Sequence, residues 1–177
     1  MISLILPLTR DEPALLDTLG ACVSGVAEGV IRDAVLVTPH LSEPMEQMSD
    51  AAGCKVVIAQ GGRSELVSAG AKVARSDWWL VLTPGMIPSG PWLADLGSFI
   101  NLADPGDVGV TRLAARGSWL DACEAGLLPV LARLTGNPDP RLGLLMHRRQ
   151  WTPRHRPAKG SRWVTLQATM HDRRQAR

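Results

Sequence analysis

Short apolar runs alternate with stretches of helical periodicity along most of this chain. Four apolar runs predict strands, at residues 2–6, 34–37, 55–59 and 78–82. Between the last two runs, a helix face is marked by Leu66, Ala69, Gly70 and Val73. The fourth run is unbroken and apolar, which is typical of a strand buried on both faces, and the first run is expected to be buried in the same way. The order of the elements therefore favours an open α/β sheet.

Two further helices are marked by longer stripes of large apolar residues. The first stripe consists of Leu15, Leu16, Leu19, Val23 and Val26. The second lies in a predicted helix over residues 119–134 and consists of Leu120, Cys123, Leu127, Leu131 and Leu134. Such a stripe usually packs on a core, and we expect this for the second stripe; contact with a partner or a membrane is the alternative.

The remaining elements are shorter. Helices are predicted over residues 44–52 and 92–102, and a strand over residues 108–113. Asp104 and Asp107 flank a Pro-Gly pair, and we interpret both carboxylates as turn formers rather than metal ligands.

The stretch from Gln60 to Gly90 has the features of a ligand site. Gly61, Gly62 and Arg63 suit a tight loop that closes over an anion, and a helix and a buried strand follow. The turn over residues 83–85 ends that strand abruptly. In open α/β sheets, ligands bind beside the carboxyl ends of the strands. We therefore expect the site at this edge.

The same stretch resembles the middle of a family 2 glycosyltransferase, an inverting GT-A type that uses nucleotide-diphosphate sugars. The family order of Gly-Arg, Ala-Gly-Ala, Ala-Arg-Gly-Asp and an apolar strand is matched by Gly62-Arg63, Ala69-Gly70-Ala71, Ala74-Arg75-Ser76-Asp77 and Trp78–Leu82. The family's Asp-x-Asp metal motif is replaced by Thr83-Pro84-Gly85.

The resemblance implies a single GT-A-like, Rossmann-like domain over residues 1–150. Its sheet would be mixed and mostly parallel, with helices on both faces. A doubly wound nucleotide-binding fold of another kind stays open, because buried strands and glycine loops are common to both.

The resemblance also implies a set of nucleotide- or diphosphate-binding residues. They are Pro7, Asp11, Thr38, Gly62, Arg63, Thr83 and Arg141. Asp11 is equally suited to cap the first helix. An acidic residue that lies near the acceptor in the family falls on Arg141 here, and Asp139 lies two positions earlier. Asp139 is therefore the one candidate catalytic residue, and the catalytic base is otherwise unknown.

Inverting transfer needs a general base and positive charge to stabilise the leaving nucleotide diphosphate. Thr83-Pro84-Gly85 offers a single hydroxyl, whereas a divalent ion prefers several oxygen ligands. We therefore predict no metal site and no Mn²⁺ or Mg²⁺ cofactor. Arg63, together with Arg10 or Arg141, could contact the diphosphate directly instead.

The charge of the chain is unevenly distributed. Residues 141–177 contain ten basic residues and one acid, whereas residues 1–140 contain nine basic and sixteen acidic residues. We expect residues 151–177 to form a basic, partly disordered tail. Such a tail suits contact with a lipid-linked acceptor or the inner face of a membrane, or it is simply solvated.

The composition favours a cytoplasmic protein. The three cysteines, Cys22, Cys54 and Cys123, are scattered without a CxxC pair, which predicts reduced core residues. No run is long enough to cross a bilayer, and the apolar amino terminus is too short for a signal peptide.

Three functions follow from these observations. The first is a small inverting glycosyltransferase of the hexosyltransferase class, although the metal and base carboxylates of the family are missing. The second is a catalytically inert GT-A domain that binds a nucleotide or acts as a regulatory or assembly partner. The third is a basic-tailed binder of anionic lipid or nucleic acid; no specific nucleic-acid motif supports it. The donor, the acceptor and the oligomeric state do not follow from the sequence.

Overall fold

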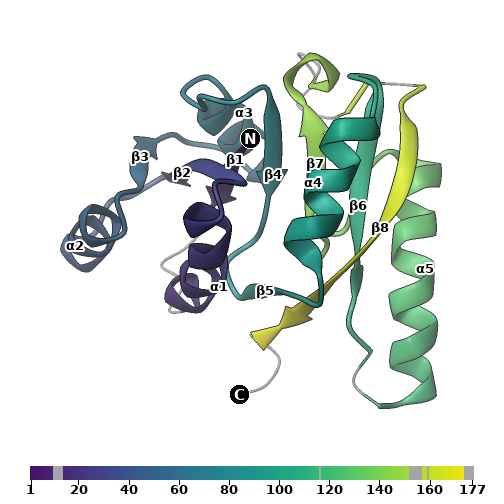
Figure 1. The fold of residues 1–177 in the computed structure, drawn as a ribbon. Helices are drawn as coiled ribbons and strands as arrows, with labels where there is room; N and C mark the ends of the chain where they lie inside the picture. The colour runs from purple at the N-terminus through teal and green to yellow at the C-terminus, as the bar shows by residue number, and fades with distance from the viewer. Residues whose placement is uncertain (10–13, 116, 152–156, 159, 174–177) are drawn as a thin grey trace.

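The protein is a single domain built on one eight-stranded sheet with helices on both faces (Figure 1). The computed structural model describes residues 1–9, 14–115, 117–151, 157–158 and 160–173. The elements in chain order are β1 (Ile2–Pro7), α1 (Leu15–Ala27), β2 (Ile31–Thr38), α2 (Glu43–Ala51), β3 (Lys55–Ile58), α3 (Arg63–Ala71), β4 (Trp78–Val81), β5 (Met86–Ser89), α4 (Trp92–Leu102), β6 (Asp107–Leu113), α5 (Trp119–Thr135), β7 (Leu144–His147), η1 (Arg148–Gln150) and β8 (Arg162–Asp172).

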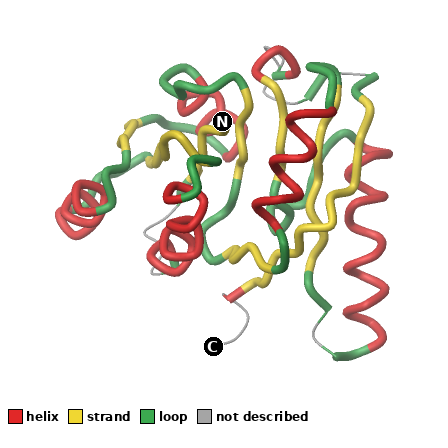
Figure 2. Tube along the Cα trace, viewed as in Figure 1, coloured by secondary structure: helices red, strands yellow, loops and turns green. Residues whose placement is uncertain are grey.

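The sheet has a parallel half and a mixed half. Its strand order is β3-β2-β1-β4-β7-β6-β8-β5, and the first four strands are parallel to one another. β7 is antiparallel to both β4 and β6, β8 is parallel to β6, and β5 is antiparallel to β8. Figure 2 shows the strands in yellow and the helices that cover them in red. The carboxyl ends of β1, β2, β3 and β4 therefore meet at one edge of the sheet.

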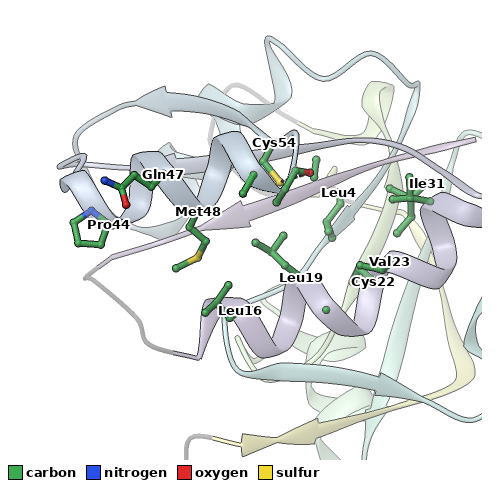
Figure 3. Close-up of a pocket in the computed structure, with 15 residues that line it drawn as sticks. Leu4, Leu16, Leu19, Cys22, Val23, Ile31, Pro44, Gln47, Met48 and Cys54 are labelled. Atoms are coloured by element: carbon green, nitrogen blue, oxygen red, sulfur yellow. Dashed lines mark hydrogen bonds between the residues drawn. The ribbon is translucent and has the colours of Figure 1, made fainter.

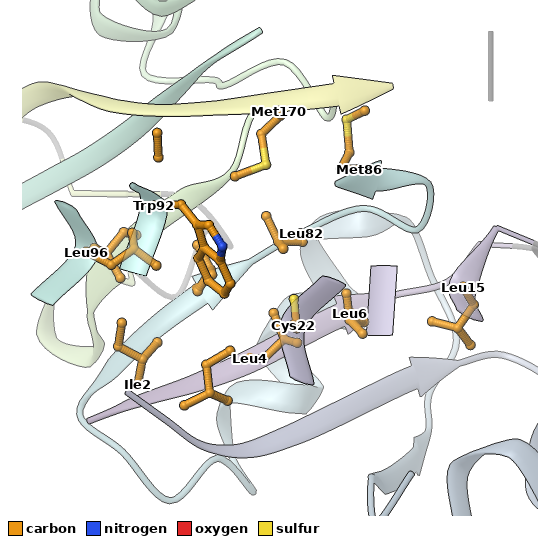
Figure 4. Packing of buried hydrophobic residues seen from close by; sticks show 14 of the residues in the cluster. Ile2, Leu4, Leu6, Leu15, Cys22, Leu82, Met86, Trp92, Leu96 and Met170 are labelled. Carbon is orange, nitrogen blue, oxygen red and sulfur yellow. The ribbon is translucent and has the colours of Figure 1, made fainter. Parts of the chain in front are cut away.

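Alternate residues of each central strand point to opposite faces, where they pack against different helices. Leu4 and Leu6 of β1 lie in a cluster with residues of α1, α2 and α4, some of which are seen in Figure 4. Ile5, between them, packs with Leu66 and Val67 of α3. α5 covers this second face farther along the sheet, next to β6. The mostly parallel sheet with helices on both faces confirms the predicted fold class.

Three strands were not predicted, namely β5, β7 and β8. β5 forms where proline and glycine suggest irregular backbone, and β8 lies within the residues expected to form a basic tail. β8 is inserted between β6 and β5, and its alternation of exposed and buried residues buries Leu166, Ala168 and Met170. Arg162 at its start pairs with the buried Asp107, at 2.5 Å between Nη2 and Oδ2. The rest of the expected tail, residues 152–156, 159 and 174–177, lies outside the described residues.

The prediction that the stripe on α5 packs on the core is wrong. Its four leucines are all strongly exposed, and Cys123 is exposed as well. The helix packs on the core with the partly buried Leu128 and with smaller residues, and its buried positions are Pro129 and Ala132. The stripe on α1 is also turned outward in part, since Val23 and Val26 are more than half exposed. Among the described residues, none of the helices has the length and apolar character that crossing a membrane requires.

Candidate functional site

The carboxyl edge of the parallel half brings together residues that are far apart in the sequence. Pro7 and Thr38 end the paired strands β1 and β2, and Thr83 follows β4. Thr38 is buried, and its hydroxyl donates to the carbonyl of His40 at 2.6 Å and accepts from the His40 amide at 3.3 Å. Its side chain therefore folds back on its own loop. Asp11, also predicted for this edge, lies outside the described residues.

Thr83 connects β4 to the loop over residues 136–141. Its hydroxyl donates to the Pro140 carbonyl at 2.6 Å, and Thr83 itself is buried. Two residues on, the Gly85 amide donates to the Thr18 hydroxyl of α1 at 2.8 Å, and Gly85 has a positive φ of 88°. The turn that replaces the Asp-x-Asp motif is thus held on both sides by hydrogen bonds, and it presents no carboxylate.

Gly62 and Arg63 form the start of α3, directly after β3. Gly61 has a φ of 119°, in the region that glycine adopts most readily, and Gly62 is the extended residue before the helix. Gln60 ties this loop to the next one, because its side-chain amide donates to the Pro39 carbonyl at 3.0 Å. The first amides of a helix attract anions, so the backbone here suits a phosphate group.

Asp139 and Arg141 form a compact ion pair in the loop over residues 136–141. One Asp139 carboxylate oxygen accepts from the Arg141 amide at 2.8 Å and from its Nε at 3.0 Å, and the other accepts from Nη2 at 3.1 Å. Arg141 Nη2 also donates to Glu124 of α5 at 2.7 Å. Arg141, predicted to bind a diphosphate, is thus shared between two carboxylates.

The environment of Asp139 makes it a weak base. Partial burial by itself raises the pKa of this carboxyl, but the hydrogen bonds and charge of Arg141, with the charge of Arg63, bring the pKa below its ordinary value. The same hydrogen bonds raise the pKa of Arg141. An efficient general base has a pKa close to the working pH, and the lowered pKa of Asp139 does not meet this condition.

Arg63 belongs to this group of charges, because its positive charge contributes to lowering the pKa of Asp139. Arg63 comes from the start of α3 and Arg141 from the loop before β7, and the charge of each lowers the pKa of the same carboxylate. Sequence reasoning singled out Arg63, Asp139 and Arg141 separately, but it gave no indication that they share one cluster or that Glu124 joins it. Within the described residues, no three His, Cys, Asp or Glu side chains are grouped so as to hold a metal ion.

A large apolar cavity lies elsewhere, over the sheet between α1 and α2 (Figure 3). Its volume is about 600 Å³, and its walls include Leu4, Leu19, Met48 and the side chain of Gln47. None of the predicted nucleotide-binding residues lines it. A nearly uncharged lining cannot compensate for the desolvation of a diphosphate, so this cavity is not the nucleotide site.

Comparisons with known proteins identify the fold. No protein-family model matches the sequence, and no curated protein matches it either. Among solved structures, the chain is similar to glucosyl-3-phosphoglycerate synthase from Mycobacterium tuberculosis in complex with phosphoglyceric acid, with a TM-score of 0.62 and 15% identity. The match covers 85% of this chain and 58% of that one.

Two further structures give the same result. The synthase in complex with Mn²⁺ and uridine-diphosphate-glucose matches with a TM-score of 0.62 at 15% identity, over 85% of this chain and 57% of that one. A second mycobacterial protein matches with a TM-score of 0.63 at 16% identity, over 97% of this chain and 65% of that one. The chain spans less than two thirds of the length of these neighbours, and at this identity the likeness shows the GT-A-like, Rossmann-like fold.

Proposed function

We propose that this chain is a glycosyltransferase-like protein that binds the diphosphate of a nucleotide sugar at the carboxyl edge of β1, β2 and β4. The observation that carries the proposal is that Arg63 and Arg141, from different elements beside that edge, both act on Asp139. Arg63 supplies positive charge that a leaving diphosphate requires, and Arg141 adds to it where a phosphate oxygen replaces Glu124 or Asp139 as its partner. In this proposal the arginines, and not a metal ion, hold the nucleotide.

Several features of the site support this assignment. Structural neighbours with this fold were solved with uridine diphosphate and with uridine-diphosphate-glucose. The amides at the start of α3 lie next to Arg63 and add a partial positive charge for the same phosphates. Pro7 and Thr38 end neighbouring strands, where the base and ribose of the nucleotide would lie in a GT-A arrangement.

The experiment is a calorimetric titration of the protein with UDP, GDP and dTDP, each with and without Mn²⁺. We expect binding that is independent of the metal and is lost in Arg63→Ala. Arg32→Ala is the matched control, because Arg32 is an exposed arginine at the opposite end of β2. Absence of binding to all three nucleotides would refute the proposal, and binding that requires Mn²⁺ would refute the arginine-held diphosphate.

A second candidate function is nucleotide binding without transfer, and the ion pair and lowered pKa of Asp139 favour it. This carboxylate is held by Arg141 and has a lowered pKa, so it is a poor acceptor for the proton of an acceptor hydroxyl. Hydrolysis of a bound nucleotide sugar by the purified protein would separate the two functions. Turnover that is lost in Arg63→Ala supports a transferase, whereas tight binding without turnover supports an inert nucleotide-binding domain.

A further inference from the structure

α5 carries its large apolar side chains on the side turned away from the protein. We define this leucine face as the six residues Trp119, Leu120, Leu127, Val130, Leu131 and Leu134, each 49% to 76% exposed. The buried positions of the helix are Pro129 and Ala132, which lie on the opposite side at helical spacing. Figure 1 shows α5 at the edge of the molecule. The exposed fractions of the six side chains leave the leucine face open to a partner.

The leucine face is large enough for a specific interface. A fully exposed aromatic side chain presents roughly 150–250 Å², and leucine and valine present less. At the fractions exposed here, the six together present on the order of 600 Å². That area matches the largest apolar patches of monomers, which are often functional. Two such faces would bury on the order of 1,200 Å², the lower limit of stable protein–protein interfaces, before any neighbouring residue is counted.

Three leucines of the face, together with the neighbouring Cys123, are spaced symmetrically about Leu127, whereas Trp119 and Val130 lie outside this symmetry. Leu120 and Leu134 lie seven residues before and after it, and Cys123 and Leu131 lie four residues before and after it. In two antiparallel copies of α5 related by a twofold axis at Leu127, each of these residues therefore meets an apolar residue of the other copy. This self-complementarity is what a twofold interface requires.

The charges of α5 agree with such a pairing. The helix carries two acids, Asp121 and Glu124, and one base, Arg133. The leucine face itself contains none of them, so two copies can approach without burying an unpaired charge. An anionic membrane surface fits less well, because helices that bind one are rich in Lys and Arg on their polar face.

We infer that the leucine face of α5 pairs with the same face of a second copy, antiparallel and centred on Leu127. Two helices packed in this way have axes about 8–10 Å apart, which places the two copies of Leu127 in contact. Arg133 lies six residues after Leu127 and Trp119 lies eight residues before it, and both are on the same flank of the leucine face. Arg133 of one copy therefore comes beside Trp119 of the other, where a guanidinium–indole contact is favourable.

The experiment is sedimentation of the full chain at concentrations from about 1 to 100 μM, a range that spans weak and moderate interfaces. We expect a species with twice the monomer mass of 19.0 kDa. Leu127→Glu brings two carboxylates together at the axis and should weaken association at least about tenfold. Leu102→Glu is the matched control, since Leu102 is an 85% exposed leucine on α4, across the sheet, and should leave association unchanged.

A second variant tests the symmetry itself. Leu127→Cys in a Cys123→Ser background should form a covalent dimer on mild oxidation, because a disulfide needs Cα atoms within about 7 Å. Leu102→Cys in the same background should associate as before but form no covalent dimer. A chain that remains monomeric at 100 μM, a dimer that survives Leu127→Glu, or recruitment to anionic vesicles in place of dimerisation would each overturn the inference.

Discussion

Gly70, the centre of the Ala-Gly-Ala segment, sets how closely α3 approaches the sheet. A Cβ atom added there would lie 2.8 Å from Val37 Cγ2 and 2.9 Å from Ile5 Cγ2. Both neighbours are fully buried, and both are branched at Cβ, so their rotamers are restricted. They belong to adjacent central strands, which cannot move apart without breaking the hydrogen bonds between β1 and β2. We predict that Gly70→Ala destabilises the protein.

Two opposing effects determine the size of the change. Alanine is better than glycine inside a helix by about 1 kcal/mol, which favours the variant. Inserting a methyl group into a well-packed core costs about 1–3 kcal/mol, and two contacts shorter than 3.0 Å put this site at the upper end of that range. The net loss in the free energy of unfolding is therefore about 1–2 kcal/mol. The corresponding fall in Tm for a chain of this length is about 2–8 °C.

Urea unfolding followed by circular dichroism measures this difference, and two matched variants isolate its cause. Gly20 in α1 and Gly97 in α4 are also helical glycines, but an added Cβ at either would meet nothing within 4 Å. Gly20→Ala and Gly97→Ala should each gain up to about 1 kcal/mol from helix propensity alone. If Gly70→Ala is as stable as these two variants, the close approach of α3 to the sheet does not limit this position.

Two further predictions concern polar contacts. Thr83→Val removes the hydrogen bond to the Pro140 carbonyl and should lower the free energy of chemical unfolding by about 1–2 kcal/mol. If this loop positions Arg141, the variant should lose a larger free energy of nucleotide binding. The hydrogen bonds from Arg162 lower the pKa of Asp107, so this pair stabilises the fold above pH 4, and its contribution is lost as the pH falls through the lowered pKa. Asp107→Asn should therefore unfold more readily at pH 7 and show a weaker dependence on pH in the acid range; an unchanged acid profile would contradict this role.

The parallel half of the sheet could be predicted because each of its strands coincides with a mostly apolar run in the sequence. Strands buried on both faces require unbroken apolar runs such as Trp78–Leu82, and few other elements produce them. β8 gives a weaker signal, because exposed and buried residues alternate along it, and its basic start suggests a solvated tail. The neighbours that pair with it, β6 and β5, are far away in the sequence, so no local pattern identifies it.

The helix faces were harder to predict than the helices. The apolar stripe of α5 has the periodicity of a core-facing helix, and periodicity alone does not distinguish a face that meets the sheet from one that meets a partner. The informative signal lies on the other face, where Ala125, Pro129 and Ala132 are small enough to approach the sheet. Alanine and proline carry little hydrophobic weight, so a search for large apolar residues selects the wrong side.

The site could be predicted only at the level of single residues. Arg63 and Arg141 were identified from a resemblance, and the parallel strands explain why the edge should bring such residues together. The pairing of Arg141 with Glu124 depends on how α5 lies beside the loop, which local sequence does not determine. The same holds for the contact of Thr83, whose hydroxyl donates to the Pro140 carbonyl and so holds the loop.

Asp139 and Glu124 together balance the charge of Arg141, so removing the charge of Asp139 should change how the site binds a nucleotide. If the carboxylate only restrains Arg141, Asp139→Asn leaves Glu124 as the remaining carboxylate partner of the guanidinium and removes a negative charge close to the incoming phosphates. A partly exposed pair of this kind is worth up to about 1 kcal/mol, so UDP should bind about two- to fivefold more tightly by calorimetry. If Asp139 instead accepts a proton during transfer, the same variant keeps its affinity and loses turnover. Asp121→Asn is the control, because Asp121 is an acid of α5 without a contact to Arg141 and should leave both quantities unchanged. Weaker binding of UDP by Asp139→Asn would contradict both roles and would mean that the ion pair holds the loop in its binding conformation.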